Sequence, residues 1–304
     1  MRVLKSSTVN DLLHNLLVTD VQQIQSALWS AFRQTHLTPP RIVFGSAMFM
    51  PASVKLSEEV VTGIKTVFVT DQGVNGTISL YRPDGRLTAI IHAAQVTGFR
   101  TALGSLCSTN VAVKKEIKSV LVYGAGCQAY WHIKLHCMSY NSITSVTIRN
   151  RSAQRTAILV SQLAGQFPLI KFSGQDINAE VIQCNIILCC TPSTKPLFTA
   201  EYLSQTHICL IGSYKKSMHE VGQDVLDACD LLLGDNKAGI ITEAGEFQDP
   251  KACDRLIELG EYEKDDVTGN TLYKSVGFGA MDVAVADAIL KIAVSTGVGD
   301  EIDV

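Results

Sequence analysis

The sequence has no CxxC cysteine pair, no long basic run and no apolar stretch of the roughly 18 residues that a membrane span needs. The first absence argues against a zinc site or a disulfide framework, so the nine scattered cysteines are expected to be reduced thiols. The second, together with a net charge of −3, argues against nucleic acid as a partner. The third, with an N-terminus that lacks the apolar core of a signal peptide, predicts a cytoplasmic protein with no membrane partner.

The chain also lacks an HExxH motif, internal repeats and low-complexity segments. His132 and His136 are four residues apart on a predicted helix, which is a spacing that can bind a metal ion. Without the accompanying glutamate we expect no metal site. The 304 residues, of which 46% are hydrophobic and 18% charged, are enough for one large or two ordinary domains with sizeable cores.

The stretch from Ser119 to His132 has the pattern of a dinucleotide-binding strand, turn and helix. A short apolar run meets Gly124-Ala125-Gly126, and a helical pattern follows. Gly124 permits the tight turn, Gly126 lets the backbone approach a pyrophosphate, and Ala129 lets the helix pack closely on the strand. The free N–H groups at the start of the helix then face the phosphates. A glycine turn between packed elements, with no ligand, is the alternative.

Two different patterns divide the chain. From Ser119 onward, apolar strands alternate with helical segments, which predicts a parallel sheet. The N-terminal third instead has two amphipathic helices and a mostly antiparallel sheet, with turns expected at 49–52, 75–76 and 83–85. A helix over 93–111 leads out of it. The expected strands of the second part are 120–123, 143–148, 169–172, 185–190, 208–211, 231–234 and 272–276.

The last segment, 280–294, is strongly helical and has no strand after it, so it could return to pack on the first domain. We therefore expect an α/β protein with a Rossmann dinucleotide-binding domain over residues 115–279. A smaller α+β domain is expected over residues 1–114 and 280–304.

The end of the second Rossmann strand indicates which dinucleotide binds. An NAD site has Asp or Glu there to hold the ribose 2′-OH. This chain has Arg149-Asn150-Arg151-Ser152, with Asn150 21 positions after Ala129. Arg151 could pair with a 2′-phosphate, and Arg155 could assist one helical turn later. NADP(H) is therefore favoured, NAD(H) stays possible, and surface arginines without a ligand are the alternative.

A lysine interrupts the apolar strand GIKTVFVT. By alternation, Lys65 shares a face with Val67, and a lysine on an apolar strand face needs an anionic partner or ligand. Arg41 follows a Pro-Pro pair, and Arg100 lies in the helical sequence VTGFRTALGS. The three cations could converge on a substrate carboxylate, or each could be a solvated or salt-bridged surface residue.

Three polar loops follow strands of the Rossmann part: CCTPSTKPLF, IGSYKKSMHEVG and the turn in TLYKSVGFGAMD. The carboxyl ends of parallel strands border the cofactor crevice, so these loops are candidates for binding. Thr191 is the first polar residue of the first loop, and Val276 and Gly277 lie in the third. Each segment could also be no more than a connecting loop.

Several motifs together resemble the ornithine cyclodeaminase/mu-crystallin family. They occur in family order over nearly the whole chain: PPR ending at Arg41, FMPA, GIK at Lys65, the TxxRTA segment over 97–102, GAGCQA over 124–129, RNRS, CTPSTKPLF, IGSYKKSMHEV and YKSVGFGAMDVAVADA. The resemblance implies a homodimer whose N-terminal domain and C-terminal helix form the substrate and dimerisation part. It also implies a Rossmann domain, with the active site between the two.

The resemblance further implies that Arg41, Lys65 and Arg100 hold the substrate carboxylate, and that Arg100 and Thr101 lie close to the cofactor. The expected catalytic residues are Lys65, Arg100, Arg41 and Tyr214. The expected cofactor-binding residues are Thr101, Gly124, Ala125, Gly126, Gln128, Ala129, Asn150, Arg151, Ser152, Arg155, Thr191, Val276 and Gly277.

Two positions depart from the family pattern. Cyclodeaminases have an acidic residue in the loop after the fifth Rossmann strand, and counting back from Glu220 this chain has Tyr214 there. The usual Asp of the segment before TxxRTA is His92. Without the acid, ring closure of ornithine loses its general base. Tyr214, Lys215 or Lys216 could substitute.

The resulting prediction is an NADPH-dependent reductase that converts a carboxylated imine, of the cyclic ketimine type, into an amino acid. Three alternatives stay open. One is an ornithine or lysine cyclodeaminase that recycles NAD(P), and another is a non-catalytic protein of the mu-crystallin type that binds NADP(H) and a small ligand. The third is an opine or N-alkyl-amino-acid dehydrogenase.

Overall fold

The computed structural model describes residues 1–33, 37–70, 73–180, 182–263 and 267–303, and the chain divides into two compact units. Unit 1 comprises Met1–Arg100 and Gly277–Val304, and unit 2 comprises Thr101–Val276. The division falls inside helix α3 (Ala93–Ala112), whereas the sequence-based boundary follows this helix.

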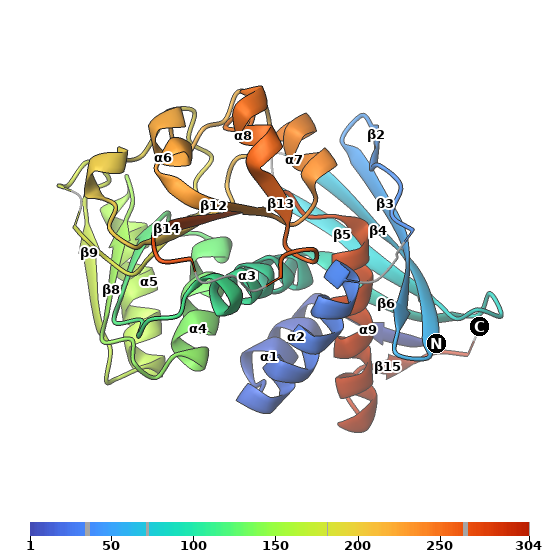
Figure 1. Ribbon diagram of the computed structural model, residues 1–304. Helices are drawn as coiled ribbons and strands as arrows, with labels where there is room; N and C mark the ends of the chain where they lie inside the picture. Colours follow the sequence, from blue (N-terminus) through green and yellow to red (C-terminus); the bar gives the residue numbers. More distant parts are fainter. Residues whose placement is uncertain (34–36, 71–72, 181, 264–266, 304) are drawn as a thin grey trace. The chain divides into compact units, whose positions relative to one another are not determined.

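A seven-stranded sheet of described residues forms the centre of unit 1 (Figure 1). The order is β15-β1-β6-β5-β4-β3-β2, and neighbouring strands are antiparallel except for β1 and β6. The strands are β1 (Arg2–Leu4), β2 (Ile42–Phe44), β3 (Ala47–Leu56), β4 (Glu59–Thr70), β5 (Gly73–Tyr81), β6 (Leu87–His92) and β15 (Asp300–Glu301).

Helix α9 (Gly279–Ser295) packs on this sheet against β3, β4 and β5, and against helix α2 (Val18–Arg33). Its sequence is apolar around most of its circumference, as in a helix that is covered on all sides. The expected C-terminal helix is therefore confirmed, and it lies in unit 1. Helix α1 (Ser6–His14) contacts β6.

Two of the three turns expected in this unit are wrong. The segment 49–52 lies inside β3. Pro51 is tolerated in this strand because its nitrogen lies between two pairings on the same side of β3: β2 pairs only as far as Phe49, and the N–H of Ser53 donates to the Leu37 carbonyl oxygen. Asn75-Gly76 lies inside β5, where a Cβ on Gly76 would stand 2.1 Å from the Thr66 carbonyl oxygen.

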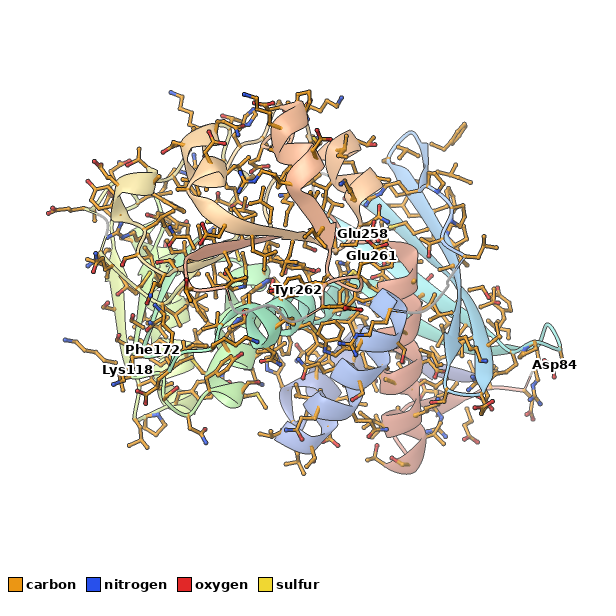
Figure 2. All side chains as sticks on the ribbon, in the orientation of Figure 1. Asp84, Lys118, Phe172, Glu258, Glu261 and Tyr262 are labelled. Carbon is orange, nitrogen blue, oxygen red and sulfur yellow. The ribbon has the colours of Figure 1, made fainter. Side chains whose placement is uncertain are left out.

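The third expected turn is confirmed. Pro83 to Gly85 connects β5 to β6, Gly85 has a φ of +83°, and Asp84 lies at the tip (Figure 2). Gly85 permits the left-handed backbone conformation that this turn requires.

Within the described residues, an eight-stranded parallel sheet forms the centre of unit 2 and confirms the predicted fold class (Figure 1). The order is β13-β12-β14-β11-β10-β7-β8-β9. The central strands are buried on both faces, which explains their continuous apolar runs. The strands are β7 (Ser119–Tyr123), β8 (Ser145–Arg149), β9 (Lys171–Gln175), β10 (Ile186–Cys189), β11 (His207–Leu210), β12 (Cys229–Gly234), β13 (Leu256–Glu258) and β14 (Asn270–Lys274).

Helices cover both faces of this sheet (Figure 1), with α4 on one face and α6 and α8 on the other. The order of the strands reverses at β7, because the chain runs outward through β8 and β9 and then returns to β10 on the other side of β7. In open α/β sheets, ligands bind outside the carboxyl ends of the strands at such a reversal, which here lies at β7 and β10. The helices are α4 (Cys127–Ser139), α5 (Ala153–Gln166), α6 (Gln223–Asp227), α7 (Lys237–Glu243) and α8 (Pro250–Arg255), with a 3-10 turn at Ala200–Tyr202.

The predicted third strand of this sheet is displaced along the chain. It was expected over 169–172 and is observed as β9 at 171–175. Leu169, which suggested the strand, is 95% exposed. An edge strand such as β9 has one unpaired side and a polar sequence, KFSGQ, so its hydrophobic signal is weak.

Three buried histidines of unit 2 bind hydroxyl groups of α3. The Nε2 atoms of His132, His136 and His207 lie 2.9, 3.1 and 3.1 Å from the Oγ atoms of Ser105, Thr109 and Ser108, respectively. In His132 and His136 the Nδ1 atom lies 2.7 Å from a backbone carbonyl oxygen, to which it must donate. Burial is the main cause that lowers the pKa of His132 to about 3, of His136 to about 4 and of His207 to about 3.

All nine cysteines are free thiols. No described group of three His, Cys, Asp or Glu side chains could hold a metal ion. Within the described residues, no helix is both long and apolar enough to cross a bilayer.

The histidines make unit 2 sensitive to acid. Their folded pKa values lie below the unfolded value of about 6.5, so their contribution to stability is complete above pH 6.5 and is lost as the pH falls toward 3–4. Between pH 6.5 and 5, each ring should remove up to about 2 kcal/mol from the free energy of unfolding. Urea unfolding measured across this range checks the slope.

The His207→Gln variant should flatten this slope. An equal slope in the wild type and the His207 variant would contradict the assignment.

Candidate active site

Lys65 lies on the face of β4 that is buried in unit 1. It pairs in register with Met50 of β3 and Ile78 of β5, both buried, and is itself 3% exposed. Its Nζ donates a hydrogen bond to Asp282 Oδ1 at 3.0 Å. The anionic partner that this lysine requires is therefore on α9.

Arg100 reaches the same carboxylate from α3. Its Nε donates to Asp282 Oδ1 at 2.9 Å, and the side chain is almost fully buried. The guanidinium lies against the backbone of Gly277, where a Cβ would stand 2.3 Å from Nη2. Gly277 has a φ of +78°, and its carbonyl oxygen accepts a hydrogen bond from Arg41 Nη2 at 2.9 Å. The turn before α9 thus supports two arginines.

The three expected cations therefore gather around one carboxylate and one glycine of unit 1. Within the described residues, the two buried cations Lys65 and Arg100 share the single carboxylate of Asp282, which gives this pair of cations an excess of positive charge that favours a further anion. Burial lowers the pKa of Lys65 to about 8; Asp282 opposes this shift, while Arg100 and Arg41 add to it. Burial raises the pKa of Asp282, but Arg100 and Lys65 outweigh it and hold the pKa below its usual value.

Asp282 was not recognised from the sequence. The available signal was the same as for Lys65: a charged residue inside an apolar element, here the helix GAMDVAVADAILKIAV. Asp282 is fully buried, which a carboxylate tolerates only with cationic partners.

The glycine turn of unit 2 has the geometry that a dinucleotide requires. Gly124 has a φ of +107°, and a Cβ there would stand 2.5 Å from the Cys190 carbonyl oxygen. Gly126 is the N-cap of α4, with no side-chain cap and open space around its Cβ position. Ala129 is buried, and the Gln128 side-chain oxygen is buried without a partner among the described residues. The turn therefore fits a pyrophosphate, which would bind the uncapped N–H groups of α4.

The arginines after β8 have two different environments. Arg149 is fully buried, and its guanidinium donates to the Gln175 side chain and to the carbonyl oxygens of Ala179 and Glu180. Arg151 and Arg155 are exposed, and neither forms an ion pair within the described residues.

The start of α5 follows directly. Ser152 is its N-cap and accepts a hydrogen bond from the N–H of Arg155. Asn150 donates to the Ser152 carbonyl oxygen, so both residues are used in shaping the turn.

A buried carboxylate connects the ends of β10 and β11. Glu220 Oε1 accepts hydrogen bonds from the N–H and the hydroxyl of Thr191, and Oε2 accepts from the N–H groups of Ile211 and Gly212. Burial raises the pKa of Glu220, although Lys274 opposes the shift. The Thr191 hydroxyl is thus already bound within the protein.

A second carboxylate extends this network. Glu246 accepts hydrogen bonds from the backbone N–H of Glu220 and from Ser213 Oγ, and Lys274 Nζ donates to both Ser213 oxygens, Oγ and the carbonyl. Asp235 similarly accepts from Ser275 Oγ and from the N–H of Val276. Sequence reasoning missed these residues, because their partners come from distant loops.

Tyr214 lies on the loop between these anchored ends. Its side chain is 49% exposed, and the Lys215 ammonium lies 5.6 Å from the ring centroid. Lys215 and Lys216 are also exposed. Where a cyclodeaminase has an acidic residue in this loop, this chain therefore exposes the phenol of Tyr214 and the ammonium groups of Lys215 and Lys216.

Comparisons with known proteins agree with this architecture. The model of the ornithine cyclodeaminase/mu-crystallin family matches residues 4–297. A Delta(1)-pyrroline-2-carboxylate reductase of Bacillus cereus is 25% identical over 278 residues, covering 85% of each chain.

Two solved structures show the same fold. The Delta(1)-pyrroline-2-carboxylate reductase of Thermococcus litoralis, in complex with NADH and L-proline, has a TM-score of 0.87 at 19% identity and covers 99% of this chain and all of its own. An archaeal alanine dehydrogenase dimer with bound NAD has a TM-score of 0.86 at 21% identity, with coverage of 100% and 99%.

The packing of Arg100 on Gly277 can be tested by adding a methyl group. Gly277→Ala should lower the free energy of unfolding by about 2–4 kcal/mol, because it combines an unfavourable φ with a clash against the guanidinium. Thermal unfolding measures the loss.

Gly85→Ala is the matched control, since its φ is also positive but nothing lies within 4 Å of the Cβ position. It should cost about 1 kcal/mol from backbone strain alone. Equal losses in the two variants would refute the close approach of Arg100.

Proposed function

This chain belongs to the ornithine cyclodeaminase/mu-crystallin family, and we propose that it is an NADPH-dependent reductase of a small carboxylated imine. The imine is of the pyrroline-2-carboxylate class, and the product is an amino acid. The pyrroline-2-carboxylate reductase from B. cereus supports this class of substrate. The observation that carries the proposal is the buried cluster of Lys65, Arg100 and Asp282 with its excess of positive charge.

Lys65 and Arg100 hold the substrate carboxylate, and Arg41, which precedes β2 and donates to the Gly277 carbonyl oxygen, contributes to the same site. Charge-assisted hydrogen bonds from a guanidinium and an ammonium fix the orientation of a carboxylate as well as binding it. Because both groups are almost fully buried, their attraction for an anion is little weakened by water.

The uncapped N–H groups after Gly126 would hold the dinucleotide, with Ala125 and Gln128 in the same turn; Thr101, Val276 and Gly277 are the further expected contacts. When bound, the dinucleotide supplies the two electrons and the hydrogen that convert the C=N bond into an amine. The exposed guanidinium groups of Arg151 and Arg155 and the absence of a carboxylate at 149–152 favour NADP(H) over NAD(H).

The amine nitrogen also needs a proton. Lys65 has a pKa of about 8 and is therefore mostly protonated at pH 7, yet close enough to neutrality to release a proton. We assign Lys65 two roles: it binds the substrate carboxylate, and it donates this proton. Tyr214 and water are the alternative proton donors.

We also propose that the chain forms a homodimer through unit 1. The edge strand β2 presents three exposed apolar side chains, of which Phe44 is 81% exposed. An exposed apolar edge strand is a site of pairing or association unless it is covered. The dimeric alanine dehydrogenase of similar fold supports this assembly. The cytoplasmic location expected from the sequence stays a prediction.

The reaction class can be decided by measuring two products together. With pyrroline-2-carboxylate, the protein should oxidise NADPH in a one-to-one ratio to the amino acid formed and release no ammonia. A panel of keto acids, amines, ornithine and lysine, read by NADPH absorbance and an ammonia assay, makes this measurement. Ammonia from ornithine without net NADPH oxidation would identify a cyclodeaminase instead, and NADPH binding without turnover would indicate a binding protein.

Lys65→Met should raise the KM for the imine at least ~10-fold, because one charge-assisted hydrogen bond contributes about 1.5–3 kcal/mol. The affinity for NADPH, measured in the absence of imine, should be unchanged in this variant. Unchanged kinetics would remove Lys65 from the site.

The preference for NADPH can be tested at Arg151. Arg151→Ala should weaken NADPH binding by ~10-fold or more and NADH binding much less, because only NADPH carries the 2′-phosphate. Fluorescence titration with both dinucleotides gives the two ratios. Arg86→Ala, which removes an exposed arginine of unit 1, is the control. Equal losses for the two dinucleotides would argue against the 2′-phosphate contact.

A further inference from the structure

Asp282 uses its two carboxylate oxygens unequally. Lys65 Nζ and Arg100 Nε both donate to Oδ1, at 3.0 and 2.9 Å. Oδ2 is buried and has no hydrogen-bond partner among the described residues. Because each nitrogen lies about 3 Å from the same oxygen, the two nitrogens are at most about 6 Å apart. A substrate carboxylate can bridge two donors at such a separation.

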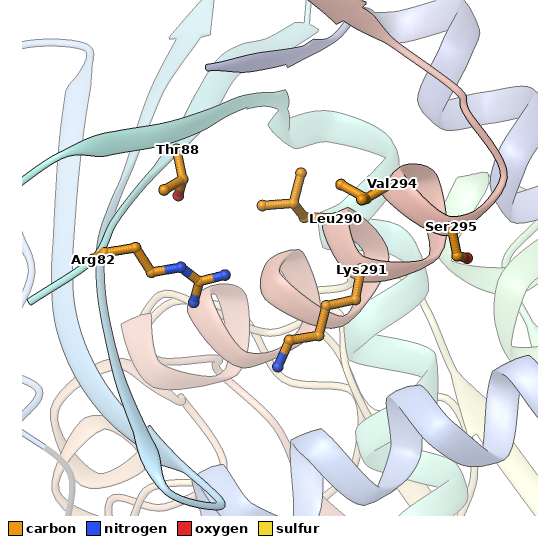
Figure 3. Close-up of a pocket in the computed structure, with 6 residues that line it drawn as sticks. All are labelled: Arg82, Thr88, Leu290, Lys291, Val294 and Ser295. Carbon is orange, nitrogen blue, oxygen red and sulfur yellow. The ribbon is translucent and has the colours of Figure 1, made fainter.

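Asp287, five residues later on α9, is also buried but has the opposite arrangement. Arg82 Nη1 lies 3.1 Å from its Oδ1, and Lys291 Nζ lies 2.9 Å from its Oδ2. The two cations of this second cluster line a hollow on unit 1 (Figure 3). Asp287 thus has one cation near each oxygen, although its Oδ2 forms no hydrogen bond within the described residues. Asp282 instead has both of its cations on Oδ1, so that Lys65 Nζ and Arg100 Nε share one oxygen.

From this contrast we propose that Asp282 is a positioning residue of the carboxylate site: it holds Lys65 and Arg100 on one oxygen, at a separation that one substrate carboxylate can bridge. This inference rests on the proposed function, since it concerns how the same cations bind substrate. Asp282 itself does not contact the substrate carboxylate, which it would repel.

The charges around Lys65 give the sign of the expected pH effect. The groups that act on it are Asp282 from α9, Arg100 from α3 and Arg41 before β2. Of these, only the Asp282 carboxylate raises the pKa of Lys65, against burial and the two arginines. Substrate binding should therefore fall as the pH rises through about 8, when Lys65 becomes neutral. Without Asp282, this loss should begin at lower pH.

The test compares pH profiles of kcat/KM in the wild type, Asp282→Asn and Asp287→Asn. In Asp282→Asn the alkaline limb should move down by at least about one pH unit, and the KM for the imine should rise at least ~10-fold. Asp287→Asn removes a buried carboxylate from the same helix, so it should lower the melting temperature but leave the KM and the alkaline limb unchanged. An unmoved limb in Asp282→Asn, or an equal shift in Asp287→Asn, would overturn the proposal.

A conservative variant covers the case in which Asp282→Asn does not fold. Asp282→Glu keeps the negative charge but displaces the accepting oxygen. The alkaline limb should then stay near that of the wild type, while the KM rises because the two cations are no longer held in the same positions. A wild-type KM in Asp282→Glu would overturn the positioning role.

A measurement without turnover separates this inference from the proposed function. The rate at which acetic anhydride acylates Lys65, followed by mass spectrometry across pH 6–10, reports the fraction of neutral amine. The titration should lie near pH 8 in the wild type and lower in Asp282→Asn. No imine reduction by the wild type would refute the proposed function, whereas identical Lys65 titrations would refute the role of Asp282 at any level of activity.

Discussion

A carboxylate buried between two cations is the interaction on which the candidate site depends. Asp282 is fully buried on an apolar helix, and Lys65 is buried on an apolar strand, so neither would be tolerated without the other. Arg100 adds a second cation to the same oxygen, and the cluster acquires more positive than negative charge. The energetic cost of burying these groups is offset by their mutual attraction, and the remaining imbalance is what an anionic substrate would satisfy.

Hydrogen-bond donors are also used in two different ways at the carboxyl ends of the strands in unit 2. At the carboxyl ends of β10 and β11, Glu220 accepts hydrogen bonds from three backbone N–H groups and one hydroxyl. The turn after β7 is left without such a cap at Gly126. The protein thus satisfies its own donors where loops must be rigid and leaves donors open where a phosphate can bind.

Buried polar groups in this chain therefore serve two purposes that burial alone does not distinguish. His132, His136 and His207 are fully buried, but each bonds neighbouring hydroxyl or carbonyl groups and is neutral, so they join α3 to its neighbours in unit 2. Lys65 and Arg100 are nearly as buried, yet they carry unbalanced charge. Two buried cations that share one carboxylate oxygen, and not burial alone, identify the candidate site.

The sequence by itself determined the class of fold, the glycine turn and the three cations. Continuous apolar runs, small residues at set spacings and a lysine in an apolar strand are local signals that a linear pattern retains. It did not locate Asp282 as their partner, assign Pro51 to a strand or place β9. These were decided by tertiary structure, because ion pairing, burial and strand pairing depend on groups that are distant in the chain and meet only on folding: Lys65 and Asp282 are 217 positions apart.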